Sequence, residues 1–337
     1  LIMNIALVYG GDSSEREISR LSGENMASHL SKDKYTVYEI NIRGNSWTLQ
    51  AVNEADVPPA EIDKNDFSLW YREKKICFDA VLVMIHGTPG ENGIFTSYLE
   101  MLNIPHTACP ARVALLTFDK FACKSFLRQA GVKMAPEVRL TLNNKDTEWT
   151  DLALKKLGPM PWFVKPNAAG SSFGVSRVDR IEDLSSAIEA AFREDNSVLI
   201  EQYIKGREFT NGIMKTARRE FLLPVTEIIP HSHCGFFNYE AKYQGASAEV
   251  TPADIPVAFA DKIREMSSCI YDYLLCKGVV RIDYIVRGED IYFLEVNTIP
   301  GMTKKSLVPQ QIEAAGMTIG GFLDELICSA INEHKRS

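Results

Sequence analysis

Two short apolar segments near the C-terminal end of this 337-residue chain constrain its fold more than any other feature. Residues 279–286 and 291–294 are rich in β-branched and aromatic side chains, and an Arg-Gly-Glu-Asp sequence at 287–290 separates them. This pattern predicts two antiparallel strands joined by a tight turn. Asp283 and Glu295 are then expected to lie near each other on neighbouring strands.

The polar side chains of this hairpin indicate a metal–phosphate site. Asp283, Glu295 and Asn297 offer two carboxylates and an amide oxygen, with no Cys or His among them, and such an oxygen set suits Mg²⁺ that bridges phosphates. Arg281 precedes Asp283 by two residues, so it is expected on the same face, where it can offer positive charge to the reacting group. Either acid alone is more typical of a solvated edge-strand carboxylate. The complete set, with the Pro-Gly turn at 300–301, favours the metal site.

Earlier segments supply what such a site needs to hold a nucleotide. An apolar strand at 162–165 ends in Lys165 and runs into small residues at 167–174, whose backbone N–H groups and hydroxyls can close over phosphate oxygens. No P-loop sequence and no dinucleotide-binding glycine fingerprint occurs. A further strand at 198–204 is placed to present backbone groups to a purine edge, with Glu208 beyond it for ribose hydroxyls.

Taken in their order and spacing, these motifs resemble the ATP-grasp enzymes, and more closely the D-alanine–D-alanine ligase family. The resemblance runs almost from end to end of the chain, and the ordered set is far more specific than any one motif. The segments that carry it are residues 10–19, 86–87, 90–93, 119–120, the Lys165 strand with its serine loop, 239–243, 281–283, 295–298 and 300–309.

The strand–helix pattern and the resemblance together predict an α/β protein with α+β character in its C-terminal part. The expected architecture is an ATP-grasp fold preceded by an N-terminal parallel-sheet (pre-ATP-grasp) domain, because strands that alternate with helices form parallel sheets. Three domains are predicted: an N-terminal substrate-binding domain at 1–107, a central ATP-grasp domain at 108–204 and a C-terminal ATP-grasp domain at 205–337. In the last domain, a strand at 221–229 is expected to lead into a polar lid loop at 231–255.

The activity that the resemblance implies is the ATP-dependent ligation of two D-alanine molecules for peptidoglycan precursor synthesis. The carboxylate of the first D-alanine would take the γ-phosphate and become an acylphosphate. The amine of the second would then displace phosphate to give D-alanyl-D-alanine. Two Mg²⁺ ions are expected to spread the charge that develops during phosphoryl transfer, and Mn²⁺ is expected to substitute for them.

The resemblance also implies a role for each site residue. Arg281 and the N–H of Gly301 would form an oxyanion hole, and Glu15 would hold the ammonium of the first D-alanine. Tyr243 would latch the lid by hydrogen bonding toward Glu15 and Ser171. The implied catalytic residues are Glu15, Ser171, Tyr243, Arg281, Gly301 and Ser306, and the substrate-binding residues are Glu15, His86, Ser306 and Leu307. The implied ATP-binding residues are Lys120, Phe163, Lys165, Ser171, Ser172, Glu201, Gln202, Tyr203, Ile204, Glu208, Lys242 and Leu294, and the metal ligands are Asp283, Glu295 and Asn297.

Two other functions remain open at this stage. The chain could be a D-alanine–D-serine ligase or, less readily, a D-alanine–D-lactate ligase, since the lactate enzymes carry a different residue where Tyr243 stands. It could also be a non-catalytic nucleotide-binding module that kept the fold, because fold alone does not fix function. The complete polar set around Arg281 disfavours that module, since a mere nucleotide binder does not need an oxyanion arginine.

Composition favours a cytoplasmic enzyme that works on small molecules. The net charge of −7 argues against nucleic acid or an anionic membrane as the main partner. No apolar run reaches transmembrane length, and we expect no secretory or transit segment. The seven cysteines are scattered without a Cys-x-x-Cys pair, which is typical of reduced thiols in the cytosol. A homodimer is expected from the resemblance.

Overall fold

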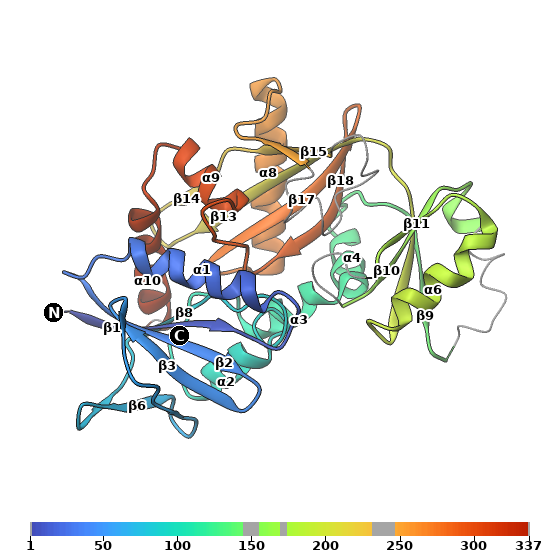
Figure 1. Ribbon diagram of the computed structural model, residues 1–337. Helices are drawn as coiled ribbons and strands as arrows, with labels where there is room; N and C mark the ends of the chain where they lie inside the picture. Colours follow the sequence, from blue (N-terminus) through green and yellow to red (C-terminus); the bar gives the residue numbers. More distant parts are fainter. Residues whose placement is uncertain (1, 144–154, 169–173, 231–246, 336–337) are drawn as a thin grey trace.

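Three larger β-sheets and one small one contain the strands of the computed structural model, which describes residues 2–143, 155–168, 174–230 and 247–335. The first sheet lies near the N-terminus, the second forms the outlying green part of Figure 1, and the third carries the C-terminal hairpin.

The first sheet is mixed, and the expectation of a purely parallel sheet is wrong. Its strand order is β4-β3-β2-β1-β8, in which β1 is parallel to β2 and β8, whereas β3 is antiparallel to β2 and β4 is antiparallel to β3. The cause is local, because Arg43 pairs with Ser46 across a two-residue connection and a connection that short permits only an antiparallel hairpin. Residues 62–76 add a small antiparallel sheet, β5-β6-β7, that was not expected.

The second and third sheets are antiparallel throughout. The second has the order β11-β10-β12-β9, and α6 packs against β10. The third has the order β16-β15-β13-β17-β18, with β14 paired to β13 and α8 packed against β13.

Three expectations for the third sheet are corrected. The strand expected at 221–229 is two strands, β14 and β15, on either side of Pro224, which has no N–H for a ladder bond. Strand β13 was not predicted. The stretch 231–255 is not all loop, since Ser247–Val250 forms the edge strand β16, which pairs with β15 alone. Residues 231–246 lie outside the described residues.

The bounds of the elements agree with most of the expected strands and helices. The strands are β1 Met3–Gly10, β2 Tyr35–Arg43, β3 Ser46–Val52, β4 Ala55–Asp56, β5 Ile62–Asp63, β6 Ser68–Tyr71, β7 Lys74–Ile76, β8 Ala80–Val83, β9 Glu137–Thr141, β10 Trp162–Pro166, β11 Ser176–Val178, β12 Ser197–Gln202, β13 Arg207–Lys215, β14 Glu220–Leu222, β15 Thr226–Pro230, β16 Ser247–Val250, β17 Val279–Arg287 and β18 Asp290–Asn297. The helices are α1 Arg16–His29, α2 Ile94–Met101, α3 Ala111–Phe118, α4 Lys120–Arg128, the 3₁₀ helix η1 Ile181–Asp183, α6 Leu184–Phe192, α8 Val257–Leu274, α9 Leu307–Ala314 and α10 Ile319–His334.

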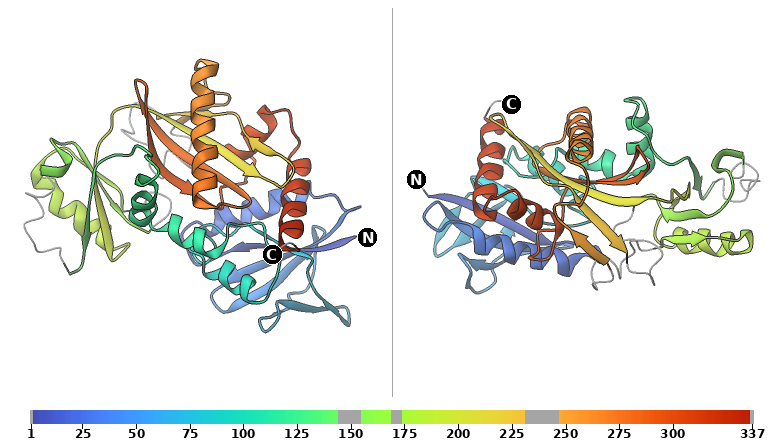
Figure 2. Two further views of the ribbon diagram at one scale, coloured as in Figure 1. Left: turned by 180° about the vertical axis from the view of Figure 1, so that it is seen from behind. Right: turned by 90° about the horizontal axis from the view of Figure 1, so that it is seen from above.

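The last helix belongs to the core of the first sheet. Helix α10 packs against α1 and β8, and Figure 2 shows it beside the N-terminal strands. Phe322 and Leu326 are buried with Leu7, Met26 and other apolar residues of the N-terminal elements. The two ends of the chain are therefore joined through one hydrophobic core.

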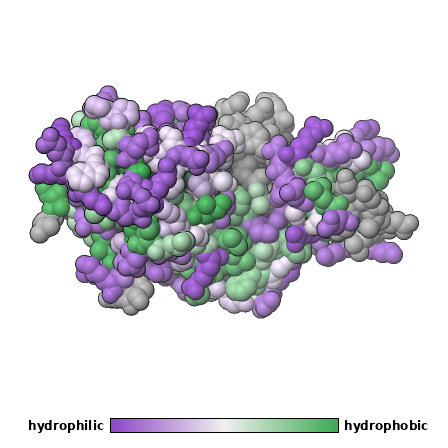
Figure 3. Space-filling model, turned by 90° about the horizontal axis from the view of Figure 1, so that it is seen from below, coloured by the Kyte–Doolittle hydropathy of each residue, from purple (hydrophilic) through white to green (hydrophobic). Residues whose placement is uncertain are grey.

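In the part of the chain that the structure describes, no single helix is both long and apolar enough to cross a membrane. The pair α9 and α10 meets the length and composition criteria together, but a bend of 105° separates the two helices. The apolar face of α10 is instead covered by the core of the first sheet. On the face of the molecule shown in Figure 3, hydrophilic side chains surround smaller apolar areas.

Truncation of Phe322 tests this shared core. Phe322 is 1% exposed and contacts the Phe221 ring edge-to-face at 5.6 Å between centroids. We expect Phe322→Ala to lower the free energy of unfolding by about 3–5 kcal/mol, because it removes a buried aromatic ring. Met101→Ala is the control, since Met101 is 85% exposed and its loss should change stability by less than about 0.5 kcal/mol. Urea denaturation of both variants measures the difference, and equal stabilities would contradict the shared core.

Candidate active site

The C-terminal hairpin forms as predicted and brings the expected metal-ligand residues together. Asp283 of β17 is paired with Glu295 of β18, and Arg281 is paired with Asn297. The hairpin turn allows this register because Gly288 takes a positive φ of 62° at the turn. The four side chains therefore come from neighbouring positions on two adjacent strands.

A β-bulge sets which side chains of β18 face the site. Asp283 pairs with Glu295 whereas Tyr284 pairs with Phe293, so Leu294 is the extra residue. Phe293 and Val296 are buried, while Leu294 and Glu295 are both partly exposed. Strict alternation would have put Leu294 and Glu295 on opposite faces. The bulge thus allows the adjacent residues Leu294 and Glu295 to lie on the same, partly exposed face of β18.

Hydrogen bonds fix the Asp283 carboxylate from three directions. Arg281 donates from Nε to Oδ1 at 2.9 Å and from a terminal nitrogen to Oδ2 at 2.8 Å, which is a bidentate pair. The Thr210 hydroxyl donates to Oδ1 at 2.6 Å, and the Asn297 amide nitrogen donates to Oδ2 at 3.0 Å. Asp283 is 5% exposed, so these bonds hold an ionised group in a largely dry position.

The donor set fits Mg²⁺ better than a transition metal. Among the described residues there is no group of three or more His, Cys, Asp or Glu side chains that could hold a metal. The hairpin offers instead two carboxylates and one amide, and hard cations that keep several waters are bound by few carboxylates. The Asn297 amide makes its bonds to Asp283 and to the Arg281 carbonyl through nitrogen, so its oxygen remains as a ligand atom.

Two lysines predicted to bind ATP come from separate elements, and Lys120 is the one that approaches this hairpin. Lys120 is the first residue of α4, and its ammonium nitrogen lies 3.7 Å from Oε2 of Glu295. Lys165 lies near the end of β10, with its ammonium nitrogen 2.7 Å from Oε2 of Glu201 on β12. Burial lowers the pKa of Lys165, although Glu201 opposes the shift. Lys120 thus lies beside an acid of the hairpin and Lys165 beside an acid of the second sheet. Their contacts with ATP remain a prediction.

The residues predicted to hold adenosine lie near the end of β12, on β10 beside it, and on β13 and β18 of the third sheet. Phe163 on β10 lies opposite Glu201, and its ring contacts that of Tyr203 at 5.6 Å between centroids. Ile204 is buried beside Ile285. Glu208 is on β13, and Gln202 ends β12.

The segment that follows the hairpin is held by hydrogen bonds from the N-terminal part of the chain. His86 Nδ1 lies 2.8 Å from the carbonyl oxygen of Ile299, and its Nε2 lies 3.1 Å from the Ser22 hydroxyl. The Ser22 hydroxyl accepts from the Met302 N–H at 3.1 Å, and the Asn25 amide donates to the Met302 carbonyl at 2.7 Å. We call these contacts the 299–302 clamp. They secure the backbone on both sides of Gly301.

The clamp defines the state of His86. Because the Ile299 carbonyl can only accept, Nδ1 carries the proton and Nε2 accepts from Ser22. Burial lowers the pKa of His86, which agrees with a neutral ring. Both ring nitrogens are therefore engaged in holding the 299–302 clamp.

Two acids lie beside His86. Burial and, to a smaller extent, the neighbouring Glu15 raise the pKa of Glu91 to about 7. Glu91 accepts from the N–H of Gly87 at 2.8 Å and from the N–H of Ile299 at 3.4 Å. Glu15, 9% exposed, precedes the first turn of α1. A buried pair of neighbouring carboxyl groups is a favourable place for a ligand cation.

The Ser306 segment lies against Gly301. Ser306 is the N-cap residue of α9, and Leu307 is the first residue of that helix, as predicted. The Ser306 hydroxyl accepts from the Thr303 N–H at 3.0 Å. A Cβ at position 301 would lie 2.9 Å from the Ser306 hydroxyl oxygen, so only glycine fits here without displacing that side chain.

Several residues that hold the site were not predicted from the sequence. Thr210 and Asn25 are ordinary polar residues on a strand and a helix, and no motif marks them. Lys124 was also missed, although its position four residues after Lys120 on α4 places both lysines on one helix face. Four predicted site residues, Ser171, Ser172, Lys242 and Tyr243, lie outside the described residues.

Comparison with known proteins agrees with this geometry. The family model described as D-ala D-ala ligase N-terminus matches residues 4–109, and that described as D-ala D-ala ligase C-terminus matches residues 126–328. A D-alanine–D-alanine ligase of Phocaeicola vulgatus is 43% identical over 325 residues, which cover 96% of this chain and 98% of that protein.

Solved structures match over nearly the whole chain. The VanG D-Ala:D-Ser ligase from Enterococcus faecalis has a TM-score of 0.86 at 28% identity and covers 98% of this chain and 100% of its own. The D-alanine–D-alanine ligase from Bacillus anthracis complexed with ATP has a TM-score of 0.77 at 28% identity, with 99% of each chain covered.

The three sheets and the lysine- and carboxylate-lined hairpin define an ATP-dependent ligase of the ATP-grasp class. Within that class, the chain belongs to the D-alanine–D-alanine ligase family, because both family models match and the curated relative is similar over its full length. The family and the enzyme class predicted from the sequence are confirmed.

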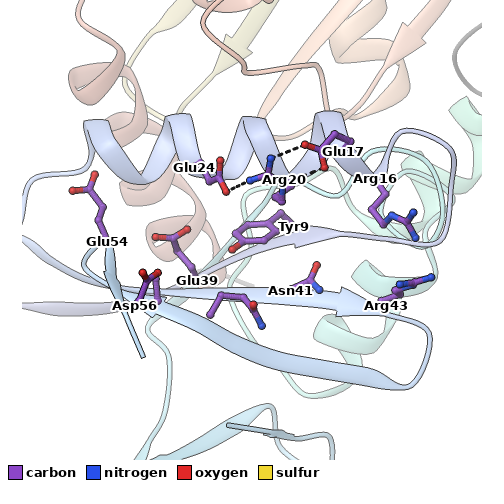
Figure 4. A pocket seen from close by; sticks show the side chains of 12 residues that line it. Tyr9, Arg16, Glu17, Arg20, Glu24, Glu39, Asn41, Arg43, Glu54 and Asp56 are labelled. Carbon is purple, nitrogen blue, oxygen red and sulfur yellow. Dashed lines mark hydrogen bonds and ion pairs between the residues drawn. The ribbon is translucent and has the colours of Figure 1, made fainter. Parts of the chain in front are cut away.

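A separate hollow of about 600 Å³ lies between α1 and the first sheet. Figure 4 shows Glu39, Glu54 and Asp56 toward one end of it and Arg16 and Arg43 toward the other, where Glu17 pairs with Arg20. Glu39 is 5% exposed at the acidic end, where burial and the nearby Glu24 raise its pKa to about 7. The hollow is lined by Tyr9, Arg16, Glu17, Arg20, Glu24, Glu39, Asn41, Arg43, Gln50, Ala51, Glu54 and Asp56.

Glu39 should make stability depend on pH. Its folded pKa of about 7 is raised above the ordinary value of 4.5, so its contribution to stability is present below pH 4.5 and is lost as pH rises to 7. Glu39→Gln removes the ionisable group and should raise the melting temperature by a few degrees at pH 8, with a smaller gain at pH 5. Thermal unfolding at both pH values checks this, with exposed Glu73→Gln as control. An equal gain at both pH values would contradict the assignment to Glu39.

Proposed function

We propose that this chain ligates two D-alanine molecules to D-alanyl-D-alanine with ATP, through an acylphosphate, for peptidoglycan precursor synthesis. The observation that carries the proposal is the register of β17 and β18, which sets Asp283 opposite Glu295 and Arg281 opposite Asn297. Membership of the D-alanine–D-alanine ligase family and the ATP-bound relative support the substrates.

The phosphates of ATP are bound between the hairpin and the lysines. Lys120 and Lys165 are placed to neutralise phosphate oxygens, since each ammonium lies beside an acid at the edge of the site. Asp283, Glu295 and Asn297 would hold Mg²⁺, which we expect as two ions and which would supply charge neutralisation to the transferring phosphoryl group. Mn²⁺ can take their place.

Arg281 and the Gly301 N–H stabilise the charge that develops on the reacting carboxyl group. The amine of the second D-alanine attacks the acylphosphate carbonyl, and the bond to phosphate breaks as the tetrahedral intermediate collapses. Arg281 is already oriented by its bidentate pair with Asp283, and the 299–302 clamp fixes the backbone around Gly301. Donors held before the reaction need little reorganisation, which favours the charged intermediate.

The two D-alanine molecules are bound at opposite sides of Gly301. Glu15 holds the ammonium of the first, with the buried Glu91 carboxyl group beside it. His86 lies behind them as part of the clamp. Ser306 and Leu307, at the start of α9, bind the carboxylate of the second D-alanine, because a helix N-terminus favours anions.

The remaining parts of the proposal concern the lid and the assembly. Ser171 and Ser172 close over the phosphates, Lys242 reaches a phosphate, and Tyr243 latches the lid at 231–255 toward Glu15. The chain acts as a cytoplasmic homodimer of three-domain subunits. The described cysteines are all free thiols, which supports a reducing compartment.

Product analysis tests the proposed activity. The protein is incubated with ATP, Mg²⁺ and D-alanine, alone or with an excess of D-serine or D-lactate, and products are identified by mass spectrometry. D-alanyl-D-alanine should dominate, and ADP should form only when D-alanine is present. Preference for the D-alanine–D-serine product would support the activity of the VanG relative instead. ATP binding without D-alanine-dependent ADP release would support a non-catalytic module.

Loss of one metal-binding carboxylate should abolish ligation while the fold is kept. We expect Asp283→Asn to lower kcat by about a hundredfold or more, because a ligand carboxylate contributes several kcal/mol to the stability of the charged transition state. The control is Asp290→Asn at the far end of the same hairpin, where the acid pairs with Lys133. In a titration with Mg²⁺, only Asp283→Asn should bind the metal more weakly and so need a higher Mg²⁺ concentration for its remaining activity. A near-normal kcat of Asp283→Asn at saturating Mg²⁺ would contradict the metal assignment.

A further inference from the structure

Lys124 is a fully buried lysine for which the reaction described above has no role. It lies on α4 and is 1% exposed. Its ammonium nitrogen contacts Oε1 of Glu201 and lies 3.3 Å from Oε2 of Glu137. Burial acts to lower the pKa of Lys124, but Glu201 and Glu137 outweigh burial and raise it. The side chain is therefore charged inside the protein.

The charges around Lys124 are not balanced. Glu137 also pairs with Arg128, and Glu201 also pairs with Lys165. Three cations thus face two carboxylates. If Lys124 were removed from these five charged residues, two ion pairs would remain, Arg128 with Glu137 and Lys165 with Glu201. The surplus positive charge in the buried group depends on Lys124.

This surplus acts on the nucleotide site through Glu201. Glu201 divides its two oxygens between Lys124 and Lys165, so it neutralises neither ammonium completely. Burial by itself raises the pKa of Glu201, but Lys124 and Lys165 outweigh it and hold the pKa well below its ordinary value. The Glu201 carboxylate stays ionised, and because Lys124 holds its other oxygen, it offsets the charge of Lys165 only in part. Burial and the charge of Lys124 both lower the pKa of Lys165, so Lys124 adds positive potential at this place.

Lys124 also fixes the helix that carries Lys120. The two lysines are four residues apart on α4 and share one face, and Lys124 connects that face to β9 and β12 through Glu137 and Glu201. The first turn of α4 is held in addition by Asn167, whose side chain accepts from the Phe121 N–H at 2.8 Å. The position of Lys120 beside Glu295 depends on this attachment.

We propose that Lys124 is a positioning residue for ATP, which keeps Glu201 shared so that Lys165 remains available to the nucleotide and which attaches the Lys120 helix to the second sheet. This inference rests on the proposed ATP-dependent ligation. It assigns no contact between Lys124 and ATP, because the side chain is enclosed by protein.

The test compares Lys124→Met with Arg128→Met. Lys124→Met leaves one cation for each carboxylate, so the variant should fold. Its KM for ATP should rise by about tenfold or more. Its KM for D-alanine should stay within about twofold of wild type. Arg128→Met breaks the other ion pair of Glu137 without touching Glu201, and its KM for ATP should stay near wild type. Direct titration with ATP should likewise show weaker ATP binding in Lys124→Met and near wild-type ATP binding in Arg128→Met.

A double variant separates positioning from stability. Lys124→Met with Glu137→Gln removes the second carboxylate that faces the vacated space, and it should fold at least as well as the single variant with the same loss of ATP affinity. An unchanged KM for ATP in Lys124→Met, an equal rise in Arg128→Met, or loss of folding in both Lys124 variants would overturn the proposal. A wild-type enzyme that forms no D-alanine-dependent ADP would instead contradict the proposed function, and the ATP titration would still test Lys124.

Discussion

The pairing of β17 with β18 is the constraint on which the rest of the site depends. One register sets Asp283 beside Glu295 and Arg281 beside Asn297, and the bulge at Leu294 adds an apolar side chain to the same face. A shift by one residue would move every one of these side chains to the opposite face. The buried neighbours Ile282, Tyr284 and Val296 oppose such a shift, because it would expose them to water.

The chemistry proposed for this hairpin needs groups from distant parts of the chain. The backbone around Gly301 is held by Ser22, Asn25 and His86, which lie more than 200 residues earlier. The same N-terminal sheet buries α10, so the hydrophobic core and the 299–302 clamp attach the C-terminal segment at two places. Packing of the two ends therefore supports the position of the proposed oxyanion donor.

The nucleotide side of the site is governed by buried charge. Glu201 and Glu137 share Lys124, Lys165 and Arg128 in a region that has little water. Buried ion pairs contribute little to net stability, because desolvation offsets their attraction, but they fix geometry when each group is satisfied. Their place here is the junction of α4 with β9, β10 and β12, from which Lys120 and Lys165, the two lysines proposed to bind phosphate, extend.

The fold class was predicted from the strand–helix pattern and from motifs ordered along almost the whole chain, and the structural matches confirm it. The hairpin, its oxygen-bearing side chains and the Lys165 strand were determined more locally. These features depend on neighbours within a few residues, where the alternation of β-branched residues and the turn at 287–290 act directly. The antiparallel pairing of β2 with β3, which makes the N-terminal sheet mixed, also has a local cause in the two-residue connection before Ser46. The sequence prediction did not include this hairpin.

Only the tertiary structure decided the roles of Lys124, Thr210, Asn25 and His86. Lys124 meets Glu201 across 77 residues and Asn25 meets Met302 across 277, and no periodicity of the chain records such contacts. A lysine on a helix face looks solvent-exposed in the sequence. It becomes a buried partner of two carboxylates only when two sheets pack around it, because packing removes the water that would otherwise separate the charges.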